Sequence, residues 1–132
     1  MAALDRPVVK PRPVYLDLVA IRQPLPAIVS ILHRISGALL FLVGIPALLW
    51  SVQLTLASPE AFGAWKSAMA HPLAKLVALA LAWAYLHHLL AGVRHLMLDL
   101  HIGLDLPAAR RSSALVLVAA LLLTALVAVR LW

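Results

Sequence analysis

The sequence of 132 residues contains no cysteine. This absence excludes disulfide bonds, thiolate-bound iron–sulfur clusters and cysteine nucleophiles on the chain. Charged residues are also scarce, at 12%, whereas 64% of the residues are hydrophobic. A soluble domain of this size has too little interior to bury so much apolar surface. The composition therefore predicts an integral membrane protein.

Acidic residues are rarer than basic ones, with 5 Asp and Glu against 11 Lys and Arg, and the formal net charge is +6. Such a charge can indicate binding to nucleic acid. Here the basic residues lie at the ends of apolar segments and in short flanks, as membrane topology requires. We therefore expect a lipid membrane and no nucleic acid as partner. Residues 1–12 precede no hydrophobic run with a small-residue cleavage site, so we expect no cleaved signal or transit peptide.

Three long stretches lack Asp, Glu, Lys and Arg: residues 35–59, 76–93 and 112–129, of 25, 18 and 18 residues. A helix needs about 20 apolar residues to span a bilayer. The sequence thus predicts an all-α integral membrane fold. We expect a cytoplasmic N-terminal segment at 1–26 and a single three-helix transmembrane domain at 27–132, with helices at about 27–56, 72–100 and 111–131.

The orientation follows from the distribution of Lys and Arg. The side of the N-terminus and the second loop carries Arg6, Lys10, Arg12, Arg22, Arg34, Arg94, Arg110 and Arg111, and the opposite side carries Lys66, Lys75 and Arg130. Loops rich in Lys and Arg stay in the cytoplasm. The N-terminus is therefore predicted to be cytoplasmic.

Polar residues within the second span are concentrated on one face. At 100° per residue, His88, Gly92, His95 and Asp99 lie within about 60° of arc, whereas the side chain of His87 points about 100° away. Ionisable residues in a membrane are costly and require a partner or a function. A neutral imidazole near the middle of the membrane is a good iron ligand, so His88 is the candidate metal ligand. The alternative is an imidazole that bonds to a carbonyl of a neighbouring helix.

The first span has a similar stripe of Ser30, Arg34, Gly37 and Phe41, with His33 at its margin. A glycine beside polar groups lets another helix or a flat cofactor approach the backbone. Both stripes lie toward the cytoplasmic side, which predicts a pocket shared by the two helices.

Several residues of these stripes have simpler interpretations. The Ser30 hydroxyl can bond back to its own helix, and Arg34 can extend to the interface. Asp99 can pair with His95 or Arg94. The cations near the interface that could hold the propionates of a haem are His33, Arg34, Arg94 and His95.

Three segments together are specific in order and spacing: Arg12-Pro-Val-Tyr-Leu-Asp-Leu18, Ser30-Ile-Leu-His-Arg-Ile-Ser-Gly37 and His88-Leu-Leu-Ala-Gly-Val-Arg-His-Leu-Met-Leu-Asp99. They resemble the cytochrome b subunit of succinate dehydrogenase, the larger membrane-anchor subunit of bacterial respiratory complex II. The resemblance covers nearly the whole chain, although the third helix matches only as an apolar span.

This resemblance implies three helices that pack with a second hydrophobic anchor subunit of three helices. A haem b would lie between the two subunits, with one axial histidine from each, and His88 is the matching histidine here. It also implies that Ser30 and Arg34 bind ubiquinone and that His33 and Arg34 lie near the haem propionates. Arg94 and His95 match an Arg-His pair of the family.

The remaining partners implied by the resemblance are an iron–sulfur subunit and a flavoprotein subunit, which carries the site of succinate oxidation. No catalytic residue for that reaction is expected on this chain, whose location would be the bacterial inner membrane. Three alternatives stay open: a quinol:fumarate reductase anchor, a haem-free structural anchor, and a small transporter or channel subunit. The last predicts polar residues along a whole path, yet the outer part of each span is almost wholly apolar.

Overall fold

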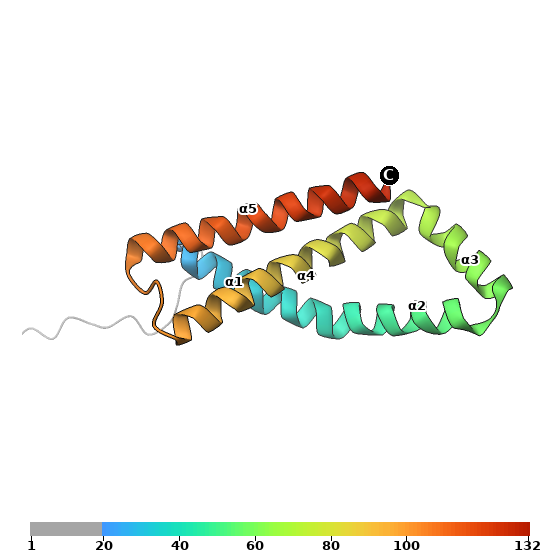
Figure 1. The fold of residues 1–132 in the computed structure, drawn as a ribbon, viewed down its shortest axis with the longest axis horizontal. Coiled ribbons are helices and arrows are strands. Elements are labelled where there is room, and N and C mark those ends of the chain that lie inside the picture. The colour runs from blue at the N-terminus through green and yellow to red at the C-terminus, as the bar shows by residue number, and fades with distance from the viewer. Residues whose placement is uncertain (1–19) are drawn as a thin grey trace, which may run out of the picture.

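The computed structural model describes residues 20–132, which are helical over most of their length (Figure 1). Arg6, Lys10 and the segment Arg12-Pro-Val-Tyr-Leu-Asp-Leu18 lie outside these described residues. The elements in chain order are α1 (Leu25–Leu39), the π-helical turn η1 (Leu40–Gly44), α2 (Ile45–Ala57), α3 (Pro59–Ala70), α4 (Pro72–Asp99) and α5 (Leu106–Leu131).

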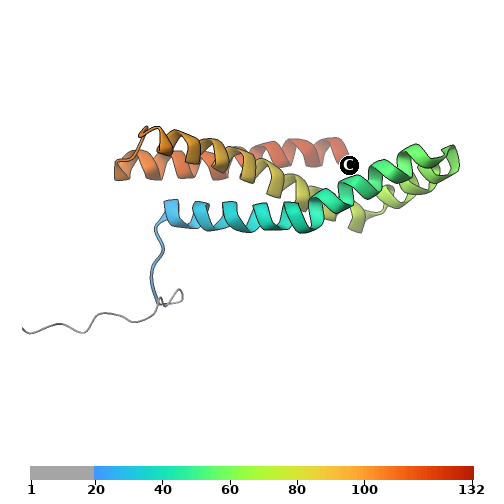
Figure 2. The ribbon, with the colours of Figure 1, turned by 90° about the horizontal axis from the view of Figure 1, so that it is seen from below.

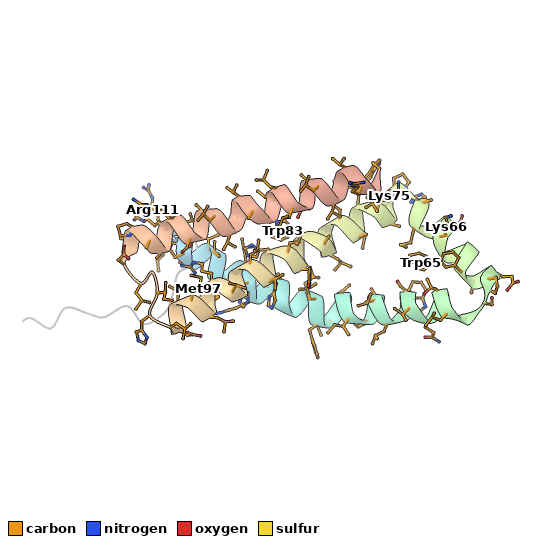
Figure 3. All side chains as sticks on the ribbon, in the orientation of Figure 1. Trp65, Lys66, Lys75, Trp83, Met97 and Arg111 are labelled. Carbon is orange, nitrogen blue, oxygen red and sulfur yellow. The ribbon has the colours of Figure 1, made fainter. Side chains whose placement is uncertain are left out.

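Three helical spans are long and apolar enough to cross a membrane: Leu25–Ala57, Pro72–Asp99 and Leu106–Leu131. The predicted all-α fold with three transmembrane helices is confirmed. Figure 3 shows Arg111 at the end of the molecule where α4 leads into α5, and Lys66 and Lys75 at the opposite end, near α3.

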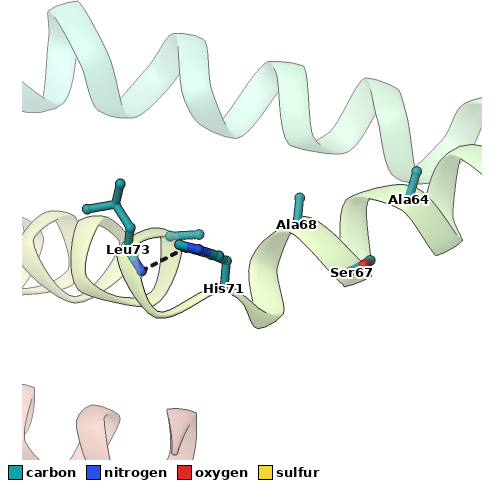
Figure 4. A pocket seen from close by; sticks show the side chains of 6 residues that line it. Ala64, Ser67, Ala68, His71 and Leu73 are labelled. Carbon is teal, nitrogen blue, oxygen red and sulfur yellow. Dashed lines mark hydrogen bonds between the residues drawn. The ribbon is translucent and has the colours of Figure 1, made fainter.

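Prolines and side-chain caps mark where the helices begin. The side chains of Ser58, His71 and Asp105 accept hydrogen bonds from backbone amides at the starts of α3, α4 and α5. Figure 4 shows the second of these bonds, from the Leu73 amide to the His71 ring at 3.2 Å. A proline in the first turn loses no backbone bond that the helix could have made. The Asp105 cap and Pro107 start α5 at Leu106, earlier than the expected residue 111.

The helices meet on α4. Helix α4 packs against both α5 and α1, and α1 also contacts α5. Toward the other end, α2 packs on α3, which leads back to α4. Figures 1 and 2 show that α2 diverges from α4 there, so that α3 closes a loop between them.

The first span changes direction near its middle. Residues Leu40–Gly44 form a π-helical turn directly before α2, in which the Ile45 amide bonds to the Leu40 carbonyl. Pro46 follows and has no amide hydrogen to donate. π-helical turns and prolines are common causes of helix bends. Pro46 by itself favours a bend, and it directly follows a π-helical turn that the sequence did not indicate.

Small residues form the buried core between α1, α4 and α5. The fully buried side chains include Val29, Ala84, Ala91 and Ala120, whereas large hydrophobic side chains point outward. Small residues let membrane helices approach closely, and outward apolar side chains suit contact with lipid or with another subunit.

Arg94 contributes to this core, although it is charged. It is 6% exposed. Its Nε donates to the Ser112 hydroxyl at 2.9 Å, and its Nη2 donates to the Ala109 carbonyl at 3.4 Å. The guanidinium therefore connects α4 to the first turns of α5.

Replacing Ser112 with alanine should lower the free energy of unfolding by about 1–3 kcal/mol, because a buried guanidinium N–H loses its acceptor. Ser113→Ala is the matched control, since the neighbouring Ser113 hydroxyl bonds only within α5, to the Ala109 carbonyl at 2.7 Å. Thermal unfolding in detergent, followed by far-UV circular dichroism, measures both. Equal losses would contradict the role given to the Arg94–Ser112 bond.

Candidate functional site: a histidine-lined contact between α1 and α4

Three imidazoles from α1 and α4 lie side by side. The rings of His33 and His88 are stacked, with centroids 4.2 Å apart and an interplanar angle of 7°. The ring of His95 lies 5.0 Å from that of His33, tilted by 45°. The structure thus brings together the two polar stripes that the sequence placed at similar depth.

Two glycines make this close approach possible. A Cβ atom on Gly37 would lie 2.7 Å from Cε1 of His88, which is too close for any real contact. A Cβ atom on Gly92 would lie 3.5 Å from Nε2 of His33, at ordinary contact distance. His88 of α4 therefore packs against Gly37 of α1, and His33 of α1 packs against Gly92 of α4. A side chain at position 37 would displace the His88 ring.

The His88 ring is held by a backbone carbonyl. Its Nδ1 lies 3.0 Å from the carbonyl oxygen of His33. A carbonyl can only accept, so this contact requires the hydrogen on Nδ1. Nε2 is then the unprotonated nitrogen, and it makes no hydrogen bond within residues 20–132. His88 therefore has the tautomer of a metal-ligating histidine whose second nitrogen is fixed by the protein.

Ser36 belongs to the same group, and the sequence reasoning did not identify it. Its side chain is 2% exposed. The hydroxyl donates to the His33 carbonyl at 3.0 Å and lies 3.4 Å from Nδ1 of His88. Its position three residues after His33 and next to Gly37 was the signal that could have indicated it.

His87 lies on a different face of α4, as helical periodicity predicted. It is fully buried, and its ring stacks on Trp83 at 5.3 Å. The Val29 backbone lies near, but neither ring nitrogen of His87 meets the hydrogen-bond geometry with any residue of the described part of the chain. The two adjacent histidines thus have separate surroundings, one in the core and one beside α1.

The other predicted site residues are distributed around this contact. Arg34 and Asp99 are exposed, Ser30 is partly buried, and none of these side chains forms a hydrogen bond or ion pair with another described residue. Arg94 is separate, because its guanidinium is bonded to α5.

An open cavity of about 910 Å³ lies between η1, α2 and α4, with Gly37 and His88 on its wall. Most of its other lining residues are apolar, among them Leu48, Leu81 and Met69. Residues 20–132 contain no group of three or more His, Cys, Asp or Glu side chains that could hold a metal ion. The described part of the chain therefore offers an iron one ligand at most on this wall, beside a large apolar space.

Comparisons with known proteins show the family to which the chain belongs. The family model of the succinate dehydrogenase/fumarate reductase transmembrane subunit matches residues 9–127. The chain belongs to this family. It is similar to the succinate dehydrogenase cytochrome b556 subunit of Coxiella burnetii, with 38% identity over 122 residues, or 92% of this chain and 97% of that protein. It is also similar to the subunit of the same name from Paracoccus denitrificans, with 35% identity over 115 residues, or 87% and 88% of the two chains.

Gly37→Ala should lower the free energy of unfolding by about 1–3 kcal/mol, because its Cβ would overlap the His88 ring that the His33 carbonyl holds in place. Gly92→Ala gains the same helix propensity without overlap, so we expect it to be neutral or stabilising by up to about 1 kcal/mol. Thermal unfolding of the two variants in detergent measures this difference. A similar stability for both would show that the contact at Gly37 is not limiting.

Proposed function

We propose that this chain is the membrane-anchor cytochrome b subunit of a succinate:quinone oxidoreductase, which binds haem b and forms part of the ubiquinone-reduction site. The observation that carries this proposal is His88, whose Nδ1 is held by the His33 carbonyl while its Nε2 makes no hydrogen bond to another residue of 20–132. Membership of the family supports the role as a membrane subunit, and the names of both relatives support succinate oxidation as the direction.

The residues of the α1–α4 contact fit a haem. His88 offers an imidazole nitrogen beside a large apolar cavity, and histidine is the usual proximal ligand of b-type haem. A haem bound there would supply a one-electron carrier within the membrane. Because only His88 among the histidines lines the described cavity wall, we assign the second axial ligand to the partner anchor subunit.

The haem propionates require cations toward the cytoplasmic side. We assign them to His33, Arg34 and His95, of which the two histidines form a column with His88. Arg94 was a fourth candidate. Its Nε and Nη2 donate to Ser112 and to the Ala109 carbonyl of α5, and its role near the propionates stays a prediction.

Ser30 and Arg34 are proposed to bind the quinone. They lie one helical turn apart on α1, and neither side chain has a polar partner among residues 20–132. The Ser30 hydroxyl would donate to one quinone carbonyl. The guanidinium of Arg34 would stabilise the negative charge that develops on the ring during reduction, an effect that a low dielectric constant strengthens.

The rest of the reaction is assigned to other subunits. A chain without cysteine cannot bind iron–sulfur clusters through thiolates, so electrons would arrive from an iron–sulfur subunit supplied by a flavoprotein subunit. These subunits would dock on the cytoplasmic side, near Ser30 and Arg34. The bacterial sources of both relatives support a location in the bacterial inner membrane.

His88→Ala should abolish or strongly reduce the b-type haem content of the purified complex, because it removes an iron ligand. His87→Ala is the matched control, since the neighbouring imidazole faces the core of the three-helix unit. A reduced-minus-oxidised optical spectrum, normalised to the flavin content, measures both variants. Absence of a b-type signal in the unmodified complex would refute haem binding, and equal loss in both variants would refute the choice of His88.

Ser30→Ala and Arg34→Leu should each slow ubiquinone reduction, by about tenfold or more for the arginine, since a hydrogen bond to a charged group contributes about 1.5–3 kcal/mol. Succinate oxidation with an artificial electron acceptor should persist. Steady-state assays with the two acceptors measure the difference. A parallel fall of both activities would point to failed assembly instead of a quinone site.

A further inference from the structure

The carbonyl oxygen of His33 is shared by more donors than it can serve well. It accepts from the Ser36 hydroxyl and from Nδ1 of His88, each at 3.0 Å. It also lies in the interior of α1, where the amide four residues later completes the helical hydrogen bond. A carbonyl oxygen has two lone pairs. A bond from Ser36 therefore weakens the bond that the same oxygen makes to His88.

We propose that Ser36 is a positioning residue that sets the electron-donating strength of His88 by competing for the His33 carbonyl. This inference rests on the proposed function, in which Nε2 of His88 binds the haem iron. The hydrogen bond at the second nitrogen of an iron-bound histidine controls how basic the ligand is. Ser36 thereby raises the reduction potential of the haem without touching it.

The direction follows from the geometry. A strong bond from Nδ1–H to a carbonyl gives the ring more anionic character, which stabilises oxidised iron and lowers the potential. Ser36 draws on the same acceptor and so opposes this effect. The direct contact between the Ser36 oxygen and Nδ1 would act the other way, but at 3.4 Å it lies beyond the usual range for an N–H···O bond. Competition at the carbonyl therefore dominates.

The surroundings of Ser36 keep its hydroxyl in competition with Nδ1 of His88 for the His33 carbonyl. The side chain is 2% exposed, so water cannot replace either partner. Gly37, the next residue along α1, has no side chain and so lets the His88 ring lie directly against α1. Among residues 20–132, the carbonyl oxygen of His33 is the acceptor of the Ser36 hydroxyl.

The test is a redox titration of the haem in the intact complex. Ser36→Ala should make the midpoint potential more negative, with the ratio of oxidised to reduced haem at a fixed ambient potential rising about two- to tenfold, the equivalent of one net hydrogen bond. Ser36→Cys, with a weaker donor, should shift it in the same direction by less. Ser113→Ala, which removes a buried hydroxyl of α5, should leave it unchanged.

The outcomes separate this inference from the proposed function. An unchanged potential in Ser36→Ala, or a shift to more positive values, overturns the competition while haem ligation by His88 stands. If Ser36→Ala fails to assemble, the Ser36→Cys titration decides by the same criterion. A complex without b-type haem overturns both. Electron paramagnetic resonance of the oxidised haem gives a second readout, because a stronger histidine donor changes the ligand field of the iron.

Discussion

The contact between His88 on α4 and the His33 carbonyl on α1 is the interaction around which the part of this structure that contains α1 is arranged. In a bilayer no water is available to satisfy a polar group, so an imidazole must find its partner in protein. Here the partner is a carbonyl that the helix itself already uses. The distance of 3.0 Å requires the two backbones to be close, and Gly37 is what allows it.

Helix α4 has two faces with different surroundings. One face presents Ala84, His87, Ala91 and Arg94, which are buried in the core. The other presents His88 and its column of imidazoles to α1 and to the cavity. The two faces explain why the adjacent residues His87 and His88 have different surroundings. His87 is packed like an apolar residue, whereas Nε2 of His88 has no hydrogen-bond partner within residues 20–132 and His88 lines the open cavity.

The divergence of α2 from α4 leaves space for the cavity beside His88. Close packing along the whole length of the first span would leave no space beside His88. The π-helical turn and Pro46 lie where the close contact ends and the cavity begins. The same chain thus combines a tight contact, which fixes an imidazole, with an adjacent apolar cavity, where we propose that the haem binds.

Hydropathy and helical periodicity predicted three spans, the shared depth of two polar stripes and the separate faces of His87 and His88, because these depend only on helix geometry and on the cost of polar groups in lipid. The predicted start of α5 was too late. It was placed at the edge of the stretch without charged residues, whereas the Asp105 cap starts the helix earlier. The bonds of Arg94 to Ser112 and to the Ala109 carbonyl were not predicted either, since periodicity says which way a side chain points and not which neighbour it meets.

The sequence by itself determined that this is a three-helix membrane protein of the succinate dehydrogenase/fumarate reductase transmembrane-subunit family. Only the tertiary structure decided that Arg94 bonds to α5 and that Ser36 and His88 meet at one carbonyl. The physical reason is that these contacts depend on the crossing and relative rotation of helices. Those are set by the packing of many side chains together and have no local signature in the chain.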